Sequence, residues 1–156
     1  MTLEDKQILF QVAQWCIENK YKRIEQIRQL ARTEENYLIL SKEIDRVDGQ
    51  LWQARRLHAQ ATLTLVDWLM TLDDFDWQCA YCQAKPFQVM SHFVPLPTGG
   101  TTPDNCVPAC YSCRASRRKG TDRVDHVQAY LRYLMDNRIR GMNVRLFSLP
   151  TAHEKG

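Results

Sequence analysis

The sequence predicts an α+β fold that is mostly helical: a long-helix hairpin or bundle, followed by a small module held together by zinc. Two contrasts along the chain lead to this prediction. Glycine and proline interrupt regular structure; before Pro86 the chain has only Gly49, whereas both residue types are frequent over the next twenty or so residues. Four cysteines in two closely spaced pairs flank that loop-rich stretch. The expected organisation is a helical region at 1–76, a zinc module with a final helix at 77–140, and a tail at 141–156.

The first helical segment is expected from about residue 3 to residue 31. Apolar residues recur at helical spacing in two stripes, one over 9–17 and one from Ile24 to Leu30. Polar residues separate the stripes, and the chain is expected to bend near Tyr21 and Lys22. The segment therefore predicts two amphipathic stretches.

A longer, mostly apolar repeat follows, in which the spacing alternates between four and three residues, as in helices that pack at coiled-coil geometry. Because the repeat passes Gly49 without a change of phase, we expect one long helix rather than two. Its surface has two interpretations: the core of an antiparallel bundle with the first helices, or a coiled coil that binds a second copy or a protein partner. His58 is expected to be a partly solvated packing residue. The seam consists of Leu40, Ile44, Val47, Leu51, Ala54, His58, Ala61, Leu65, Trp68 and Leu72.

A last helix is predicted after the cysteines, with Asp122 as a candidate N-cap and Gly141 as its stop. The apolar tail between residues 144 and 149 is expected to dock on the rest of the chain. One face of the helix would carry Val124, Val127, Leu131 and Leu134.

Composition and the distribution of apolar residues indicate where the protein is located in the cell, but they do not identify its function. The net charge of +3 and pI near 8.6 are only mildly basic, so the placement of charge has to identify any nucleic-acid surface. No stretch has the roughly 18 consecutive apolar residues that span a bilayer, and the first residues do not resemble a signal peptide. We therefore expect a cytoplasmic protein without a membrane partner. In that reducing environment cysteines are more often metal ligands than disulfides.

The two cysteine pairs predict a structural zinc site. Cys79 and Cys82 form one C-x2-C pair, and Cys110 and Cys113 form the other. Each pair can place two thiolates on one tetrahedral ion, and two pairs complete a closed four-sulfur shell. The segment from 79 to 120 has few large aliphatic residues, and a structural zinc contributes about 10–16 kcal/mol of coupled folding free energy. Cys16 and Cys106 fall outside the pattern and are expected to be small buried residues.

Between the pairs stands an ordered set of residues: His92, Val94-Pro95-Leu96, Gly99-Gly100, Asn105 and Val107-Pro108-Ala109. With both cysteine pairs, this order resembles the HNH endonuclease family in its four-cysteine form, over about residues 77–123. The resemblance implies the ββα-metal fold, in which a β-hairpin and a helix enclose one catalytic divalent ion such as Mg²⁺ or Mn²⁺. It implies that His92 is the general base that activates water against a DNA phosphodiester, and that Asn105 holds the loop that orients this histidine. A histidine can accept a proton at physiological pH, and an asparagine amide can bridge backbone groups.

Two positions depart from the family pattern. The residue before the histidine is usually an acid or a histidine, and the residue after the last cysteine is usually asparagine or histidine; both ligate the catalytic metal. Here these positions hold Ser91 and Arg114. Either the site is degenerate and only binds, or substitute ligands hold the metal. The candidate substitutes are Asp104, Asp122, Asp125 and His126.

A basic cluster follows the second cysteine pair, at the expected start of the last helix, where it would neutralise phosphates. Arg114 in particular would take the place of the metal and hold a phosphate group. Tyr81 and Tyr111 either stack on bases or pack around the cysteines. The cluster consists of Arg114, Arg117, Arg118, Lys119 and Arg123.

Three functions follow from these features. The first is a divalent-metal-dependent DNA endonuclease with His92 as its base. The second is a degenerate HNH module that binds nucleic acid, DNA rather than RNA, and docks on a larger complex through its helical half. The third is a structural adaptor whose long helix is the working surface.

Overall fold

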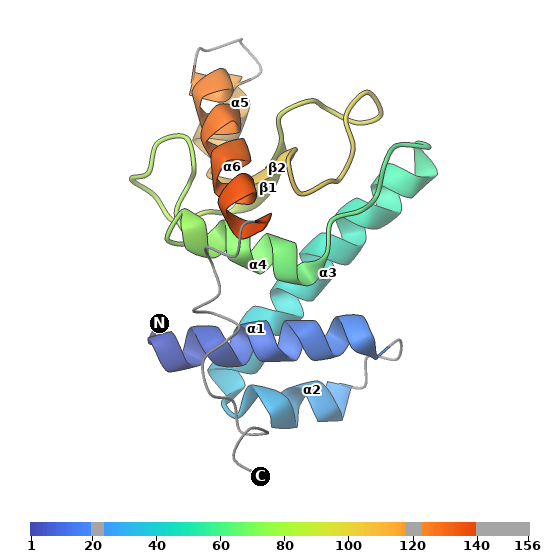
Figure 1. Ribbon diagram of the computed structural model, residues 1–156, viewed down its shortest axis with the longest axis vertical. Coiled ribbons are helices and arrows are strands. Elements are labelled where there is room, and N and C mark those ends of the chain that lie inside the picture. Colours follow the sequence, from blue (N-terminus) through green and yellow to red (C-terminus); the bar gives the residue numbers. More distant parts are fainter. Residues whose placement is uncertain (20–23, 118–122, 140–156) are drawn as a thin grey trace.

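The computed structural model describes residues 1–19, 24–117 and 123–139 of the 156-residue chain. Four helices come first, then a two-stranded hairpin, then two more helices, so the predicted mostly helical α+β fold is confirmed (Figure 1). The predicted tail at 141–156 lies outside the described residues. The elements are α1 (Leu3–Glu18), α2 (Ile24–Ala31), α3 (Glu34–Arg56), α4 (Leu65–Asp74), β1 (Val89–His92), β2 (Cys106–Ala109), α5 (Tyr111–Arg117) and α6 (Arg123–Ile139).

Three helices of the N-terminal half, α1, α3 and α4, begin at threonine caps. The Thr2 hydroxyl accepts a hydrogen bond from the backbone N–H of Asp5 at 3.1 Å, and the Asp5 carboxylate accepts from the backbone N–H of Thr2. Such a capping box satisfies two N–H groups that have no partner within the helix. Thr33 caps α3 with a single hydrogen bond, which its hydroxyl accepts from the N–H of Asn36 at 3.1 Å. The helical segments predicted within 3–31 are confirmed as α1 and α2; the bend predicted at Tyr21 and Lys22 lies outside the described residues.

The prediction of one long helix through the 40–72 seam is wrong, because the chain turns between α3 and α4. His58 has φ of 59°, in the left-handed region, and the N–H of Ala59 donates to the Ala54 carbonyl at 2.8 Å, which closes the helix end. Thr64 then starts α4 with a second capping box, to Asp67. Most of the seam is nevertheless buried, including Trp68. The apolar spacing thus predicted which side chains are buried, but not that the helix axis changes direction.

The linker between α3 and α4 pairs with the loop between β1 and β2. The N–H groups of Thr62 and Leu63 both donate to the Thr101 carbonyl at 3.0 Å, and the Thr101 N–H donates to the Gln60 carbonyl at 2.8 Å. Buried backbone groups need hydrogen-bond partners, and here the linker and the loop provide partners for each other. The β1–β2 hairpin is thereby joined to the end of α3 (Figure 1).

β1 and β2 pair antiparallel, with His92 opposite Cys106 and Val89 opposite Ala109. All four residues of β2 are buried, because successive side chains of a strand point to opposite faces and both faces are covered. Cys106 belongs to the core formed with α1–α4, whereas Val107 and Ala109 belong to a second core around the cysteines. β2 therefore separates the two cores.

A buried ionic network also joins the two halves. Glu43, 3% exposed, accepts hydrogen bonds from the Trp68 indole at 2.9 Å and from Arg46 Nε at 2.8 Å. Arg46 also donates to the Gln88 carbonyl at 2.9 Å and lies over the Phe87 ring. A buried charge is tolerated when it is paired and hydrogen-bonded, and this pair links α3, α4 and the segment before β1.

The second cysteine pair leads into α5, a separate short helix, and Arg114 lies on α5. The prediction that placed Arg114 on the last helix is therefore wrong. The last helix is α6, which buries Leu131 completely and packs Val127 and Leu134 on the second core, as the apolar spacing predicted. Its predicted cap, Asp122, and stop, Gly141, lie outside the described residues. No helix in the described ranges combines the length and the apolar character that a membrane crossing requires.

Candidate functional site

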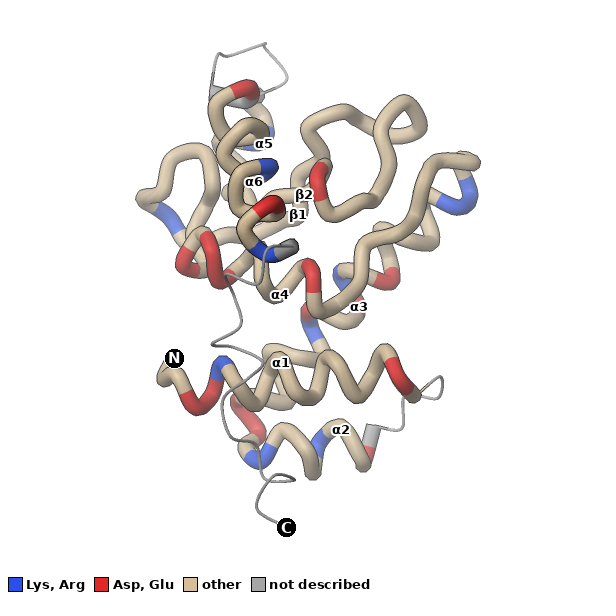
Figure 2. Tube along the Cα trace, in the orientation of Figure 1, with Lys and Arg blue, Asp and Glu red and all other residues tan. Residues whose placement is uncertain are grey.

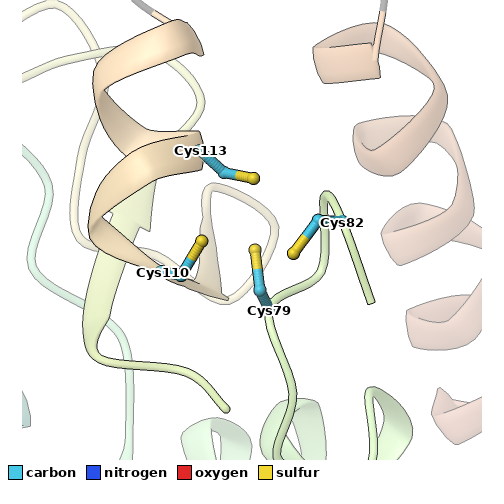
Figure 3. A group of neighbouring side chains, drawn as sticks. All are labelled: Cys79, Cys82, Cys110 and Cys113. Atoms are coloured by element: carbon cyan, nitrogen blue, oxygen red, sulfur yellow. The ribbon is translucent and has the colours of Figure 1, made fainter. Parts of the chain in front are cut away.

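The four cysteines of the two pairs converge on one point (Figure 3). Their Sγ atoms all lie within 4.8 Å of one another. In a tetrahedral zinc site with Zn–S bonds of about 2.3 Å, the sulfurs are about 3.8 Å apart, so the cluster fits one such ion. Four protein ligands leave no position for a water molecule, which is typical of a structural site. Cys79, Cys82, Cys110 and Cys113 are thus the residues that would hold zinc.

The turn after the first pair supplies N–H groups to sulfur. The N–H of Ala84, and also that of Lys85, lower the pKa of the Cys82 thiol to about 6, because they stabilise the thiolate. Burial, and after it the neighbouring cysteines, raise the pKa of the Cys113 thiol to about 12. Four crowded thiols cannot all ionise without a cation between them, so a divalent ion fits this donor set.

The remaining two cysteines belong to the cores, as expected. All six cysteines are free thiols in the structure, and Cys16 and Cys106 are 6% and 1% exposed. Burial raises the pKa of the Cys106 thiol to about 12, which makes it a poor nucleophile.

His92 ends β1, and its ring is fixed by the helical half of the protein. Its Nε2 lies 3.0 Å from the Thr101 hydroxyl, and that hydroxyl donates to the Gln50 carbonyl of α3 at 3.1 Å. A hydroxyl has a single hydrogen, so Nε2 must be the donor to Thr101. It follows that His92 carries a proton on Nε2.

Asn105 closes the loop between β1 and β2. Its Oδ1 accepts from the Val94 N–H at 2.9 Å, and its Nδ2 donates to the carbonyls of Val94 at 2.9 Å and Gly100 at 2.8 Å. Gly99 lies so close that an added Cβ would be 2.7 Å from Nδ2. Asn105 and the glycine pair therefore fix the loop that presents Thr101 to His92.

His92 and Arg114 line the same open cleft, which has a volume of 270 Å³. His92 comes from β1, Arg114 from α5 and Gln50 from α3, so three elements meet there. Ser91, the neighbour of His92, also lines the cleft and is 1% exposed. The remaining lining residues are Met90, Pro95 and Leu96.

The cleft does not fit the divalent ion that the HNH resemblance implies. None of its described lining residues is a carboxylate, which is the ligand that Mg²⁺ and Mn²⁺ prefer. Asp104 lies in a different cleft and accepts from the Thr102 hydroxyl, and Asp125 and His126 are exposed on α6. The fourth candidate, Asp122, lies outside the described residues. Among the residues that the structure places, the cysteine cluster is the only group suited to a metal.

The basic cluster is described only in part. Arg114 is half-buried in the cleft. The backbones of Arg117 and Arg123 end α5 and begin α6, but their side chains, like Arg118 and Lys119 as a whole, lie outside what the structure describes. Of the two tyrosines, Tyr81 is 8% exposed and packs edge-on against Phe93. Tyr111 is 59% exposed and remains available for stacking.

Thr101 and Gln50 were not identified from the sequence. The glycine pair before Thr101 indicated a special loop, but no spacing rule connects a threonine of one module to a carbonyl of a distant helix.

We expect Thr101→Val to release the His92 ring. Valine has the shape of threonine without the hydroxyl, so the Nε2 proton loses its acceptor and the part-buried Gln50 carbonyl loses the hydrogen bond from Thr101, at a cost of about 0.5–1.5 kcal/mol for each bond. Nitrogen NMR of the imidazole should show one Nε2–H tautomer in the wild type and in Thr101→Ser, and a mixture in Thr101→Val. An unchanged tautomer in the valine variant would contradict the role assigned to Thr101.

Comparison of the chain with protein-family models, curated proteins and solved structures found no match in any of the three.

Proposed function

We propose that this protein is an HNH-like nucleic-acid-binding protein, in which the cleft between His92 and Arg114 holds a phosphodiester group. The observation that supports this most is that one cleft contains both side chains, beside a four-cysteine cluster, with no carboxylate among its described lining residues. A guanidinium donates two parallel hydrogen bonds to a phosphate and keeps its charge at any physiological pH. Arg114 thus supplies the positive charge that a metal ion would otherwise supply.

The overall charge does not explain binding. Both signs of charge are interspersed along the N-terminal helices (Figure 2), and the net charge is only +3. Affinity has to come from local groups at the cleft, supplemented by the basic residues that follow α5 in the sequence. Zinc supports this function by holding α5, and with it Arg114, against the hairpin.

Phosphodiester hydrolysis is a second candidate, favoured by the fixed ring of His92. His92 would take a proton from the attacking water as the water oxygen bonds to phosphorus, the bond to the leaving sugar oxygen would break, and solvent would supply that oxygen with a proton, while Arg114 balances the charge on the phosphate. DNA is the expected target in both cases. A further proposal is that the helical half docks on a larger complex.

We expect Arg114→Ala to weaken binding of a labelled duplex by about tenfold or more, since a charge-assisted hydrogen bond contributes about 1.5–3 kcal/mol. The slope of log affinity against log salt should fall by about one unit. Arg114→Lys should keep the slope and lose part of the affinity. Fluorescence anisotropy measures the affinity and the salt slope of the wild type and both variants, as zinc-loaded protein with and without added Mg²⁺. Affinity that does not change with salt in the wild type would contradict the proposal.

Cleavage is tested separately, with supercoiled plasmid and zinc-loaded protein, in the presence and absence of added Mg²⁺ or Mn²⁺. Nicking that disappears in His92→Ala would support hydrolysis. Binding without nicking in the wild type would leave the protein as a binding module. Nicking that requires an added divalent ion would contradict the conclusion that the cleft does not fit such an ion.

A further inference from the structure

A second cleft lies beside the one that contains His92. It has a volume of 370 Å³ and is formed by the face of α3 toward the zinc module, the segment before β1, and the start of α5. Its lining residues are Ile39, Lys42, Glu43, Arg46, Trp77, Phe87, Gln88 and Tyr111.

The same three segments of chain form both clefts, in the same order. On α3, Arg46 lines one cleft and Gln50 the other, about 6 Å further along the helix axis. On α5, Tyr111 lines one and Arg114 the other, about one turn apart. At β1, Gln88 just before the strand lines the second cleft, and Met90, two residues later, lines the cleft that contains His92. The two clefts are therefore neighbours on the side of α3 that faces the hairpin, and we call the pair of clefts the trough, with His92 toward one end.

The exposed groups of the trough are suited to a polyanion. Lys42 is exposed on α3, and Arg114 lies one turn of α5 beyond Tyr111. The only carboxylate among the described residues that line either cleft is Glu43, whose side chain is 4% exposed and paired with Arg46 at 2.8 Å. The charge that remains on the walls is positive.

The trough also offers an aromatic face. Tyr111 is 59% exposed, and its backbone N–H donates to the Gln88 side chain at 3.0 Å, so the start of α5 is held while the ring faces solvent. Unpaired bases stack on such rings with little regard to sequence. The other large polar cleft, beyond the β1–β2 loop, includes the exposed carboxylate of Asp104 and is less suited to phosphate.

We infer that a strand of nucleic acid lies along this trough, with one phosphate on Arg114 beside His92 and the neighbouring nucleotides on Lys42 and Tyr111. The inference rests on the proposed function and adds to it the helical half of the protein: α3 is one wall of the binding site rather than only a scaffold or a partner surface.

The test compares Lys42→Ala and Tyr111→Ala with Arg132→Ala, in full-length zinc-loaded protein and with fluorescently labelled single-stranded and duplex DNA. Arg132 is a matched control, because it is an exposed cation that lines the other polar cleft. We expect Lys42→Ala to weaken binding severalfold and to reduce the salt slope by about one unit. Tyr111→Ala should weaken binding of single-stranded DNA about tenfold or more, and Tyr111→Phe should retain it. Arg132→Ala should bind like the wild type.

The outcomes separate this inference from the proposal it rests on. If Arg114→Ala weakens binding while Lys42→Ala and Tyr111→Ala do not, the trough is rejected and the proposed function stands. If Arg132→Ala weakens binding as much as Lys42→Ala, the nucleic acid does not follow the trough. Wild-type protein that binds neither DNA probe would overturn the proposed function, and the inference with it.

Discussion

Removal of zinc is expected to unfold the hairpin and α5 while α1–α4 stay folded. A structural zinc contributes about 10–16 kcal/mol, which equals or exceeds the whole stability of an ordinary domain, about 5–15 kcal/mol. The second core, which includes Phe75, Tyr81, Phe93 and Leu131, is built around the ligands themselves. The first core rests on side chains such as Leu9, Leu40 and Trp68 and includes none of the four ligands. The loss of order should therefore begin in the zinc module.

Hydrogen exchange with mass spectrometry can test this prediction, by comparing zinc-loaded protein with protein treated with a chelator. Amides of β1, β2 and α5 should lose protection, and those of α1–α4 should keep most of theirs. Cys110→Ser should reproduce the metal-free pattern in the presence of zinc. Cys16→Ala is the control, because Cys16 is also buried but belongs to the first core, and this variant should bind one zinc ion. A hairpin that stays protected without metal would show that the zinc is not structural.

We expect Gly99→Ala to destabilise the protein by about 3 kcal/mol and to release the β1–β2 loop. A Cβ at this position would lie 2.1 Å from the Val94 carbonyl oxygen and 2.7 Å from Asn105 Nδ2. Contacts this short cannot persist, so the loop has to move and the three side-chain hydrogen bonds of Asn105 are disturbed. Overpacking of this kind costs about 1–3 kcal/mol, and a buried amide left without partners adds to it.

Gly49→Ala is the matched control. Gly49 lies within α3, and an added Cβ would have no other atom within 4 Å. Because glycine inside a helix is less favourable than alanine by about 0.5–1 kcal/mol, this variant should be more stable than the wild type. Urea denaturation of the two variants should shift the midpoint in opposite directions. Equal stability of Gly99→Ala and wild type would mean that the loop can move away from Asn105 at little cost.

Much of this protein follows from local sequence. The two C-x2-C pairs predicted a four-cysteine cluster, because each pair brings two sulfurs together over a few residues and needs no information from elsewhere in the chain. Apolar spacing predicted the helices and their buried faces, including Leu131 of α6, since a 3.6-residue period is a property of one segment. The apolar spacing did not predict the turn between α3 and α4. There the direction of the chain depends on Thr64, which caps α4, and on the hydrogen bond from Thr62 to Thr101.

What the tertiary structure alone decided is how the candidate site is assembled. The Thr101 hydroxyl that fixes His92 also bonds to Gln50, 51 residues earlier in the chain. Arg114 shares a cleft with His92 and Gln50 only because the fold brings α5 and β1 near α3. Packing between distant elements also places Asp104 in a different cleft from His92. The sequence determined which residue types were available for zinc and phosphate. Which of them share a cleft depended on packing between distant elements, and no periodicity or short spacing encodes that.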